Sequence, residues 1–496
     1  MKKISKITAV ILSLTMLLTA VPVAFAGNEV DYEITNPYET IDFATINRYK
    51  ADLHSHTTFS DGNETLPAMV ERHYEMGFDI LAITDHGTVS YGYTSQTFND
   101  PLKLISWVKN GGVFTDVLAE NGKTSDGVDY RIDTDAETND EYYIETVNGQ
   151  DGHAMMRVPY GNEQNPTSFN NAHVNSWFAD WGNGVLGGTS NYETPIAAID
   201  EMGGLSVINH PGEYTNARDE ETQESAYNLD DPVYNYKINK FINMLLSYDT
   251  CLGIDINSKG DSRTRYDRKL WDILLQKIVP YGRNVYAIAT TDAHNLGIVD
   301  SGYTVMLMND LTSADLKSAM ENGQFFAASK YIGNTLEMEA YKAIAENINT
   351  TEAQQLVQML DTALANGEKF YAGENAIVPV VTNIVVDESN DTITVATDNA
   401  VVIRWIADGK EIASGATIDL DDYADEIGSY VRAEIVGVGG VLYTQAFTLD
   451  YDGAPEPEDF GFFYDFGGIV SAICDTIVKL LPYILPLKLI YFIAGV

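Results

Sequence analysis

The sequence predicts an α/β domain followed by an antiparallel β domain, and three observations support this prediction. Between residues 49 and 330, short apolar runs typical of buried strands alternate with segments of helical periodicity, which is the pattern of a mainly parallel sheet. From residue 376 to residue 452, apolar and polar residues alternate between Asn, Asp and Gly turns, as in an antiparallel sheet. At 496 residues and 45% hydrophobic content, the chain is long enough for two or more domains.

The first 26 residues read as an export signal. Lysines at positions 2, 3 and 6 precede an apolar run over residues 8–20, and Ala24 and Ala26 occupy the positions that signal peptidase requires. Because the apolar run is too short to cross a bilayer, we favour a cleaved leader over an uncleaved anchor. We therefore expect an exported protein, extracellular or at the cell surface, in which residues 27–48 form an N-terminal extension.

The α/β domain can be followed through residues 49–330. The segment PAMVERHYEMG has proline at its start and glycine at its end and reads as a helix, in which we expect His73 to be an ordinary surface residue. The stretch from about residue 90 to about residue 195 is rich in Tyr, Asn, Asp and Gly, so we interpret it as an irregular insertion on the binding face. We expect parallel strands at FDILAIT, GLSVIN, CLGIDIN and NVYAIATT.

Two further segments follow the α/β domain. Residues 331–375 are expected to form a helical connector, because TEAQQLVQMLDTALANG begins on a threonine that can cap a helix and closes on glycine. Residues 376–452 are expected to form an antiparallel β-sandwich. This segment contains neither histidine nor cysteine, which argues against a part in metal chemistry.

The last part of the chain, residues 453–496, reads as an acidic linker and an apolar tail. DGAPEPEDF is short, acidic and contains proline. The apolar segment that follows contains two prolines and charged residues at 475, 479 and 488, which weaken the signal for a membrane span. Two interpretations stay open: a tail that associates with the membrane or the cell surface, and a helix that packs on the α/β domain or on a partner.

Charge and cysteine content restrict the function further. With 72 acidic and 30 basic residues, the net charge is −42. Long nucleic acids bind through neutralised phosphates, so this charge argues against long duplex nucleic acid as a partner, while a locally positive cleft can still take a small phosphate. Cys251 and Cys474 are the only cysteines and lie far apart, so no disulfide framework holds the fold.

Histidines and aspartates recur where the predicted strands end. In ADLHSHTTFSD, His54 and His56 are two residues apart and therefore point to the same side of a strand, where both can reach one ion. Asp61 follows in a turn that can return its carboxylate to the same place. Three later strand ends add Asp85 and His86, His210, and Asp292 and His294. Because coincidence explains this recurrence poorly, we predict a metal site.

Four motifs, DLHSHTTFSDG, ITDHG, NHPGE and TTDAH, resemble in their order those of the polymerase and histidinol phosphatase (PHP) family of metal-dependent phosphoesterases. The resemblance covers about residues 49–330. It implies a distorted (β/α)7 barrel that holds two or three divalent ions at the carboxyl ends of its strands. Mixed imidazole and carboxylate ligands suit zinc, manganese or iron.

The resemblance also assigns seven of these residues to individual ions. The ligands implied for the first ion are His54, His56 and Asp292. Those implied for another are Asp61, His86 and His294, and His210 is implied as one of two histidines on the third.

The two remaining ligands of the family, a bridging glutamate and a histidine, must come from the insertion. VPYGNEQNPTSFNNAHVNSWF supplies Glu163 as the bridge and His173 for the third ion beside His210. EYYIETVNGQDGHAMM would supply Glu145 and His153 instead. We prefer Glu163 and His173, because the approach through valine and proline and the HVN segment match the family better.

Ions that share one glutamate suit the hydrolysis of a phosphate ester. They lower the pKa of a bridging water, neutralise the phosphoryl oxygens and stabilise the leaving oxygen, so no nucleophilic side chain is needed. The resemblance therefore places Glu163, Asp292 and His86 in the catalytic centre. Asp85 either orients the imidazole of His86 as part of that centre or caps a helix.

Basic residues are concentrated in DINSKGDSRTRYDRKLWD, directly after a predicted strand. Lys259, Arg263 and Arg265 are candidates for binding the phosphate of the substrate. The other interpretation, a solvated helix face with local ion pairs, is equally open for these three residues and is preferred for Arg268.

We therefore expect an exported enzyme that hydrolyses small phosphate mono- or diesters, such as nucleotides or the 5′ ends of short oligonucleotides, by metal-activated water. The alternative is a cell-surface binding or adhesion protein in which the metal site of the barrel is structural and the β-sandwich binds a partner. The near-complete ligand set argues against this alternative.

Overall fold

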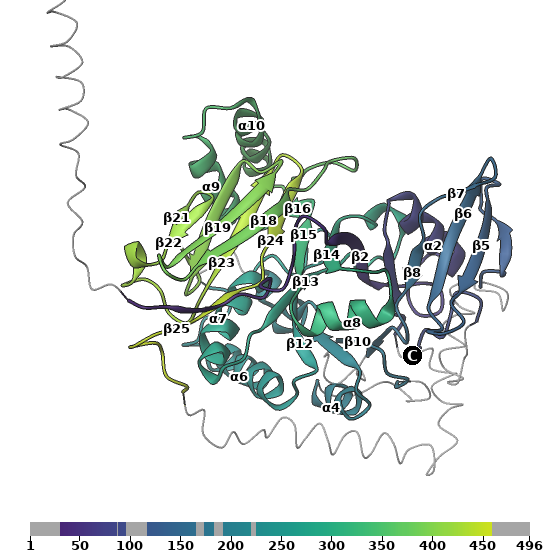
Figure 1. The fold of residues 1–496 in the computed structure, drawn as a ribbon, viewed down its shortest axis with the longest axis horizontal. Coiled ribbons are helices and arrows are strands. Elements are labelled where there is room, and N and C mark those ends of the chain that lie inside the picture. Colours follow the sequence, from purple (N-terminus) through teal and green to yellow (C-terminus); the bar gives the residue numbers. More distant parts are fainter. Residues whose placement is uncertain are drawn as a thin grey trace, which may run out of the picture.

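The computed structural model describes residues 30–86, 88–95, 117–164, 173–182, 192–219 and 225–458. It shows a mixed α/β molecule in which most helices lie at the outside of long sheets (Figure 1). The expected leader (1–26) and apolar tail (467–496) lie outside the described residues. Within the described ranges, no helix combines the length and the apolar character needed to cross a membrane.

One long sheet runs through the molecule. At its centre, β2 (Asn47–Ser55) pairs antiparallel with β14 (Gly302–Met308) and parallel with β3 (Ile80–Ile83). The last five residues of β2 are buried, as expected of a central strand. Beyond β3 the sheet continues through β8 (Met155–Arg157), β6 (Glu141–Val147), β5 (Asp129–Thr134) and β4 (Asn121–Lys123), with β7 (Gln150–Asp151) paired to β6.

A second sheet contains five strands. Its parallel strands are β11 (Leu205–Ile208), β12 (Cys251–Asn257) and β13 (Tyr286–Ala289). The strand β10 (Val174–Trp177) runs antiparallel to both β11 and β9 (Asn162–Gln164). The four apolar runs expected to form strands coincide with β3, β11, β12 and β13.

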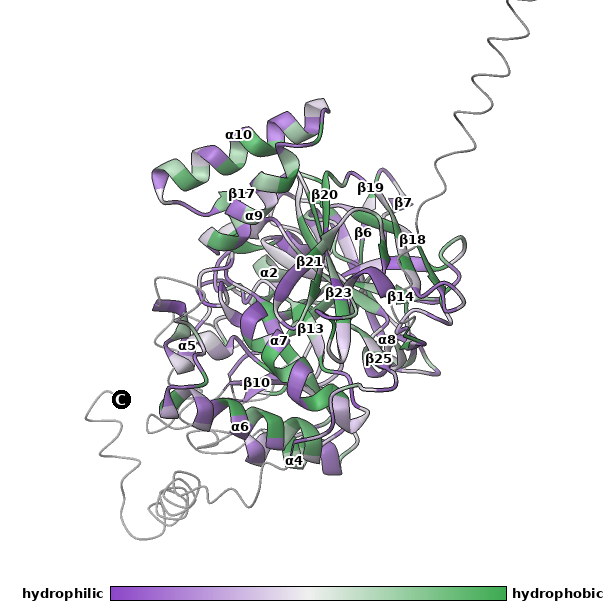
Figure 2. Cartoon of the chain, turned by 90° about the vertical axis from the view of Figure 1, so that its left-hand side faces the viewer, coloured by the Kyte–Doolittle hydropathy of each residue, from purple (hydrophilic) through white to green (hydrophobic). Residues whose placement is uncertain are grey.

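Helices pack on this second sheet. α4 (Glu193–Glu201) contacts β10 and β11, whereas α6 (Pro232–Ser247) and α7 (Asp267–Ile278) contact β12. Figure 2 shows both hydrophobic and hydrophilic residues on α6 and α7, as expected of helices with one buried side. The remaining helices of this part are α2 (Leu66–Glu75), α5 (Pro211–Thr215) and α8 (Ser313–Glu321), with 3-10 turns η1 (Ala217–Asp219), η2 (Val279–Tyr281) and η3 (Leu296–Ile298).

Two isolated bridges connect the two sheets. Ser55, the last residue of β2, bridges to Ala293, which follows β13. His86, which follows β3, bridges to Glu163 in β9. Strands from both sheets also share one hydrophobic cluster, which includes Leu53, Ala82, Trp177, Val207 and Ile288.

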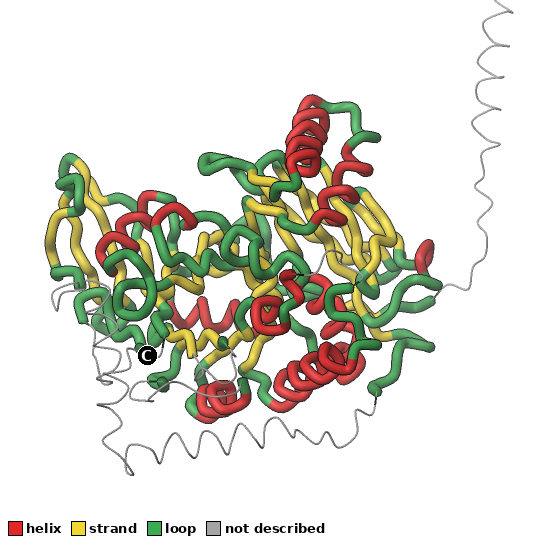
Figure 3. The backbone as a smooth tube through the Cα atoms, turned by 180° about the vertical axis from the view of Figure 1, so that it is seen from behind, coloured by secondary structure: helices red, strands yellow, loops and turns green. Residues whose placement is uncertain are grey.

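The stretch from residue 90 to residue 195 is more regular than the sequence indicates. Its described part contains the seven strands β4 to β10. The strands β4 to β7 form a ribbon at one end of the molecule, opposite the C-terminal strands (Figures 1 and 3). The strands β9 and β10 instead belong to the five-stranded sheet, so this stretch contributes directly to the centre of the fold.

The C-terminal part begins with two helices, α9 (Thr335–Ala345) and α10 (Thr351–Asn366). Thr350 caps α10 through its hydroxyl, one residue before the threonine expected from the sequence, and Gly367 ends the helix as expected, with a φ of 66°. A two-stranded sheet of β16 (Tyr331–Ile332) and β17 (Phe370–Tyr371) flanks them.

Two antiparallel sheets follow the helices. The first contains β18 (Val380–Asp387), β19 (Thr392–Asp398) and β22 (Thr417–Asp419). The second contains β20 (Val402–Ala407), β21 (Lys410–Ser414), β23 (Tyr430–Gly437), β24 (Gly440–Tyr443) and β25 (Phe447–Asp450), with the turn η4 (Asp421–Tyr423) before β23. One hydrophobic cluster includes residues from both, among them Val395, Ile418, Trp405 and Ile435.

The C-terminal strands continue the long sheet. β24 pairs with β15 (Phe325–Ser329), which in turn pairs with β14. At the other side, β1 (Glu33–Thr35) pairs with β25, so the beginning and the end of the described chain share one sheet. Backbone pairing thus connects the C-terminal part to the α/β part within one continuous sheet.

Candidate metal centre

All nine predicted metal ligands come together at one end of the two sheets. Each lies in a strand or within a few residues of one, as expected where the ends of parallel strands meet. We call these nine residues the histidine–carboxylate cluster. It consists of His54 and His56 at the end of β2, Asp61 in the turn that follows, His86 after β3, Glu163 in β9, His173 before β10, His210 after β11, and Asp292 and His294 after β13.

Glu163 lies at the centre of the cluster, and its side chain is only 1% exposed. Its Oε2 atom lies 3.0 Å from Nε2 of His56, 3.2 Å from Nε2 of His54 and 3.3 Å from Nδ1 of His86. Its Oε1 atom lies 2.9 Å from Nδ1 of His173. The two oxygens of one buried carboxylate therefore face different sets of histidines, which is the arrangement that a bridging ligand needs.

Asp292 is the second buried carboxylate of the cluster. Its Oδ1 atom lies 3.4 Å from Nε2 of His56 and 3.5 Å from Nε2 of His54. Its Oδ2 atom lies 3.4 Å from Nε2 of His210, and the same nitrogen lies 3.3 Å from Oε1 of Glu163. His54 and His210 thus each face both buried carboxylates.

Asp61 lies at the solvent side of the cluster, where its side chain is 55% exposed. Its Oδ1 atom lies 3.4 Å from Nδ1 of His56, and its Oδ2 atom lies 3.3 Å from Nε2 of His294 and 3.7 Å from Nε2 of His86. His294 also faces Asp292, at 3.4 Å. The cluster is therefore accessible from the side on which Asp61 and His294 lie.

The donor atoms fit divalent cations in chemistry and in spacing. Imidazole nitrogens and carboxylate oxygens are the ligands that zinc, manganese and iron accept. Nδ1 of His54 and Oδ1 of Asp292 are buried and make no hydrogen bond with the described residues. Within the described ranges, five overlapping groups have their donor atoms within 4.8 Å of one another: His54, His210 and Asp292; His54, His56 and Glu163; His56, Asp61 and His86; His56, Asp292 and His294; and His86, Glu163 and His173.

The histidines control the ionisation of the buried carboxylates. Burial raises the pKa of Glu163, but the neighbouring His173 and His54 outweigh this effect and hold the pKa well below its usual value. Burial likewise raises the pKa of Asp292, and His54 and Lys259 together reverse the shift. Both carboxylates are therefore charged at neutral pH and available as ligands.

The structure separates the two candidate pairs from the insertion. Glu163 and His173 lie in the cluster, as described above. Glu145 instead accepts a hydrogen bond of 3.1 Å from the hydroxyl of Tyr143. His153 stacks on Tyr74 with ring centroids 4.0 Å apart, and among the residues that the structure describes neither Glu145 nor His153 belongs to a group of neighbouring metal-ligand atoms. The geometry favours the preferred pair.

Asp85 requires a correction. Its carboxylate accepts hydrogen bonds from the amide and hydroxyl of Thr57, at 2.8 and 2.6 Å, and from the hydroxyl of Ser60, at 2.6 Å. Among the described residues 88–95 no helix follows it. Asp85 therefore neither caps a helix nor orients His86, and instead fixes the loop that carries the chain from His56 towards Asp61.

His73 also differs from the expectation, because it is buried rather than on the surface. Its Nε2 atom lies 2.8 Å from Oδ2 of Asp52, and its Nδ1 atom lies 2.8 Å from the carbonyl oxygen of Met69. Asp52 also accepts a hydrogen bond from the amide of His54, at 3.1 Å. The Asp52–His73 pair is therefore hydrogen-bonded to the end of β2. The signal was present in the sequence, since Met69 and His73 are four residues apart on one helix face.

Two polar residues beside the cluster were missed in the sequence. The side-chain amide of Asn209 donates to Oε1 of Glu163 at 2.9 Å. The hydroxyl of Tyr214 lies 2.8 Å from Nδ1 of His173. Both flank His210, so inspection of the residues one before and four after that histidine would have indicated them.

The candidate phosphate-binding residues have different surroundings. Nζ of Lys259 lies 2.9 Å from Oδ2 of Asp292, and this side chain is 20% exposed. Arg263 forms an ion pair with Glu213. The guanidinium of Arg265 stacks 5.0 Å above the ring centroid of Tyr266. Of these candidates, Lys259 is the one in direct contact with the cluster.

Arg268 has local ion pairs, as preferred from the sequence, but it is not on a solvated face. Its side chain is 1% exposed and pairs with Asp261 and Glu337, each at 2.8 Å. The expectation of a solvated position is therefore wrong, because two buried carboxylates compensate the charge inside the protein.

A comparison with protein families identifies the first part of this region. Residues 52–145 match the PHP domain. The resemblance to the PHP family is thereby confirmed. The match begins at the β2 segment that holds His54 and His56, and it includes the strand end with His86.

Solved structures that resemble the chain share little of its sequence. A two-domain protein from Bacteroides vulgatus that contains a predicted PHP-like metal-dependent phosphoesterase is 14% identical over 86% of this chain and 92% of its own, with a TM-score of 0.35. PsfC from Pseudomonas syringae is 14% identical over 64% and 99%, with a TM-score of 0.31. A lesion-specific endonuclease from Pyrococcus furiosus is 12% identical over 55% and 56%, with a TM-score of 0.27. A comparison with curated proteins gives no match.

Proposed function

We propose that the protein is a metal-dependent phosphoesterase that hydrolyses small phosphate mono- or diesters, of nucleotides or of the 5′ ends of short oligonucleotides. The position of Glu163 carries this proposal. Its two carboxylate oxygens face histidines from different strands, at distances between 2.9 and 3.3 Å. The match of residues 52–145 to the PHP domain supports the same conclusion.

The histidine–carboxylate cluster would hold two or three divalent ions of zinc, manganese or iron. Glu163 would bridge them, since it faces five of the histidines, and Asp292 would be the second shared carboxylate. When bound, such ions supply Lewis acidity to a phosphoryl group and lower the pKa of water towards neutrality. The chain's own contribution is to keep both carboxylates ionised and the imidazoles oriented.

The substrate would approach from the side of Asp61 and His294, because these are the most exposed members of the cluster. Lys259 is the best candidate for contacting a phosphoryl oxygen, because its ammonium group already lies beside Asp292. Arg263 is a weaker candidate, because its partner Glu213 is not one of the nine residues of the cluster.

We further propose the architecture that the sequence predicts around this centre. The strands β2, β3 and β9 to β13 would form the distorted seven-stranded barrel. The bridges of Ser55 to Ala293 and of His86 to Glu163 would be the two places where the two sheets join to close it. The barrel would span residues 49–330, the helical connector 331–375 and the β-sandwich 376–452. Export through the leader and attachment of the tail at the membrane or cell surface belong to the same proposal.

A phosphate-ester panel tests the function. The purified protein, stripped with a chelator and reloaded separately with zinc, manganese or iron, is assayed on bis(p-nitrophenyl) phosphate, nucleotides and short 5′-phosphorylated oligonucleotides. We expect metal-dependent turnover that His56→Ala abolishes. His153→Ala is the matched control, because this histidine lies outside the cluster.

The binding or adhesion alternative predicts a different result. A protein that retains its ions but hydrolyses no ester in the panel would contradict the phosphoesterase proposal and favour a structural metal site. Equal loss of activity in His56→Ala and His153→Ala would contradict the placement of the activity at the cluster, because the loss would then reflect general destabilisation.

A further inference from the structure

The loop between β12 and α7 has an unusual backbone next to the cluster. Lys259, Gly260 and Asp261 have φ angles of 47°, 58° and 54°, which lie in the left-handed region. Residues other than glycine are strained there and keep such a conformation only where the surroundings enforce it. The loop places Nζ of Lys259 at 2.9 Å from Oδ2 of Asp292.

Arg268 makes several hydrogen bonds with this loop. Its guanidinium donates to both oxygens of Asp261, at 2.8 and 2.9 Å. It also donates to the carbonyl oxygens of Ile256, Thr264 and Arg265, at 3.0, 3.2 and 2.9 Å. One buried guanidinium thus binds the beginning, the middle and the end of the loop, as its rigid fork of donors permits.

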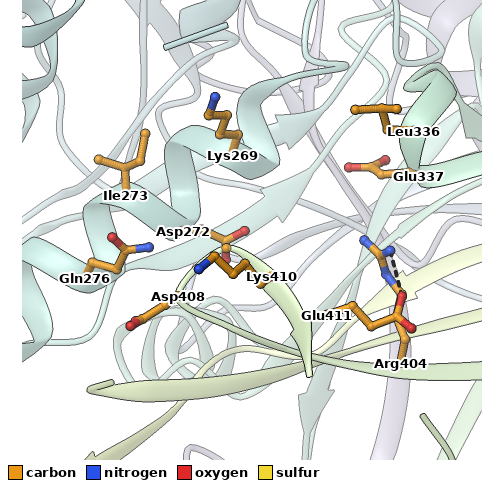
Figure 4. Close-up of a pocket in the computed structure, with 11 residues that line it drawn as sticks. Lys269, Asp272, Ile273, Gln276, Leu336, Glu337, Arg404, Asp408, Lys410 and Glu411 are labelled. Atoms are coloured by element: carbon orange, nitrogen blue, oxygen red, sulfur yellow. Dashed lines mark hydrogen bonds and ion pairs between the residues drawn. The ribbon is translucent and has the colours of Figure 1, made fainter. Parts of the chain in front are cut away.

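The helical connector holds this arginine from the other side. Glu337 in α9 accepts hydrogen bonds from Nε and Nη2 of Arg268, both at 2.8 Å. The amide of Gly333, just before α9, donates to Oδ2 of Asp261 at 2.6 Å. Glu337 lies at the edge of a cavity of about 500 Å³ between α7, α9 and the β20–β21 hairpin (Figure 4). Arg404 of this hairpin also lines the cavity.

We propose that Glu337, Arg268 and Asp261 form a positioning relay through which the connector fixes the ammonium group of Lys259 for contact with a phosphoryl oxygen. Contacts connect Glu337 of α9 to Arg268, Arg268 to the strained loop, and Lys259 of this loop to the cluster. The contact with the phosphoryl oxygen rests on the proposed function, whereas the relay itself rests on the contacts above. The connector and the α/β part therefore form one functional unit.

A double-mutant cycle tests the relay. Glu337→Gln, Lys259→Met and the double variant are prepared in the full chain, loaded with manganese, and titrated with inorganic phosphate by calorimetry. We expect Glu337→Gln to weaken phosphate binding about tenfold on its own and less than about twofold in the Lys259→Met background, because residues in one network are not additive. Equal effects in both backgrounds, or no effect in either, would overturn the proposal.

Asp272→Asn is the matched control. Asp272 is also a buried carboxylate paired with a buried arginine, Arg432 at 2.7 Å, and it lines the same cavity, but it has no contact with the loop. It should therefore lower stability without weakening phosphate binding. Should Glu337→Gln fail to fold, Arg268→Lys takes its place, since it keeps the charge and loses the fork.

Hydrolysis measured on the same variants separates the two proposals. In an active enzyme, Glu337→Gln should raise KM about tenfold with a smaller change in kcat. An additive cycle in an active enzyme would reject the relay and leave the phosphoesterase function intact. A wild-type protein that binds phosphate with a non-additive cycle, but turns over no ester, would retain the relay and reject the function.

Discussion

Oε2 of Glu163 lies 3.0 Å from Nε2 of His56, although Glu163 lies in β9 and His56 directly follows β2, a strand of the other sheet. Backbone contacts impose this proximity. The amide of Glu163 donates to the carbonyl oxygen of Thr84 at 3.0 Å, and the amide of His56 donates to that of Ala293 at 2.9 Å. Because the main chain sets the distance, single side chains of the cluster can be replaced while the others keep their positions.

Replacement of Glu163 by glutamine should remove the bridge without changing the shape of the side chain. We expect the protein to bind at least one ion fewer and kcat to fall about 10²–10³-fold, the usual cost of losing a preorganised electrostatic contact. Metal analysis after gel filtration and turnover of bis(p-nitrophenyl) phosphate measure the two effects. Glu145→Gln, outside the cluster, should match the wild type in both, and a Glu163→Gln protein with full metal content would contradict the prediction.

Removal of the ions should lower stability, because the ions bind the folded chain. At an ion concentration about 100 times Kd, binding adds about 2.7 kcal/mol per site to the free energy of unfolding. Differential scanning fluorimetry with manganese or with a chelator measures the change as a shift of Tm. His210→Ala should reduce the shift, whereas a reduction by His153→Ala would show that the shift does not report on the cluster.

The stability should also depend on pH through Asp267. Burial raises the pKa of this carboxyl to about 7 in the folded state, above its ordinary value of 3.8. Between these two values the folded chain holds a proton that the unfolded chain has released. The free energy of unfolding therefore falls as the pH rises through this window, and the deficit is complete above about pH 7.

Asp267→Asn removes this titration. In urea unfolding with a chelator present, the wild type should lose stability relative to the variant between about pH 5 and about pH 8. The exposed Asp249 provides the control substitution, Asp249→Asn, which should leave the pH dependence unchanged. If wild type and Asp267→Asn differ in free energy of unfolding by the same amount at about pH 5 and at about pH 8, Asp267 is ionised at both values. That result would contradict the prediction.

A buried charge in β23 should be important for stability rather than for activity. Glu434 pairs with Arg432 at 2.8 Å and with Arg404 at 2.6 Å. Burial raises its pKa, but these two arginines outweigh the effect and lower the pKa to about 2. Glu434→Gln removes the carboxylate that two buried arginines share, so that only Asp272 and Glu411 remain to compensate their charge, and should cost about 3–5 kcal/mol in urea unfolding. Glu411→Gln, which removes a more exposed partner of Arg404, should cost at most about 1 kcal/mol.

The strand-end ligands could be predicted because their chemistry and their position coincide. His54 and His56 share one side of a strand by parity alone, and Asp292 and His294 follow a strand in the same way. In the structure, Oδ1 of Asp292 lies within 3.5 Å of a ring nitrogen of each of the three histidines. Their proximity in space follows from the parallel arrangement of the strands, which apolar runs indicate well.

The remaining features depend on pairing between distant segments, which apolar patterns do not specify. The stretch before Glu163 contains polar strands, and their pairing depends on partners elsewhere in the chain. Asp85 has the sequence context of a cap, but the loop of Thr57 and Ser60 competes for its carboxylate. Arg268 has the context of a solvated residue, because its partner Glu337 is supplied from a helix far along the chain.

The pairing of β1 with β25 has a consequence for the order of folding. Glu33 is in register with Asp450, so the first strand of the described chain obtains its partner only after the more than 400 residues between them have been made. Until then β1 lacks its partner strand. Pairing β1 with β25 requires the closure of a very long loop, which costs conformational entropy. A chain stopped before residue 447 would leave its own beginning unpaired, so truncation at one terminus should expose the other to proteases.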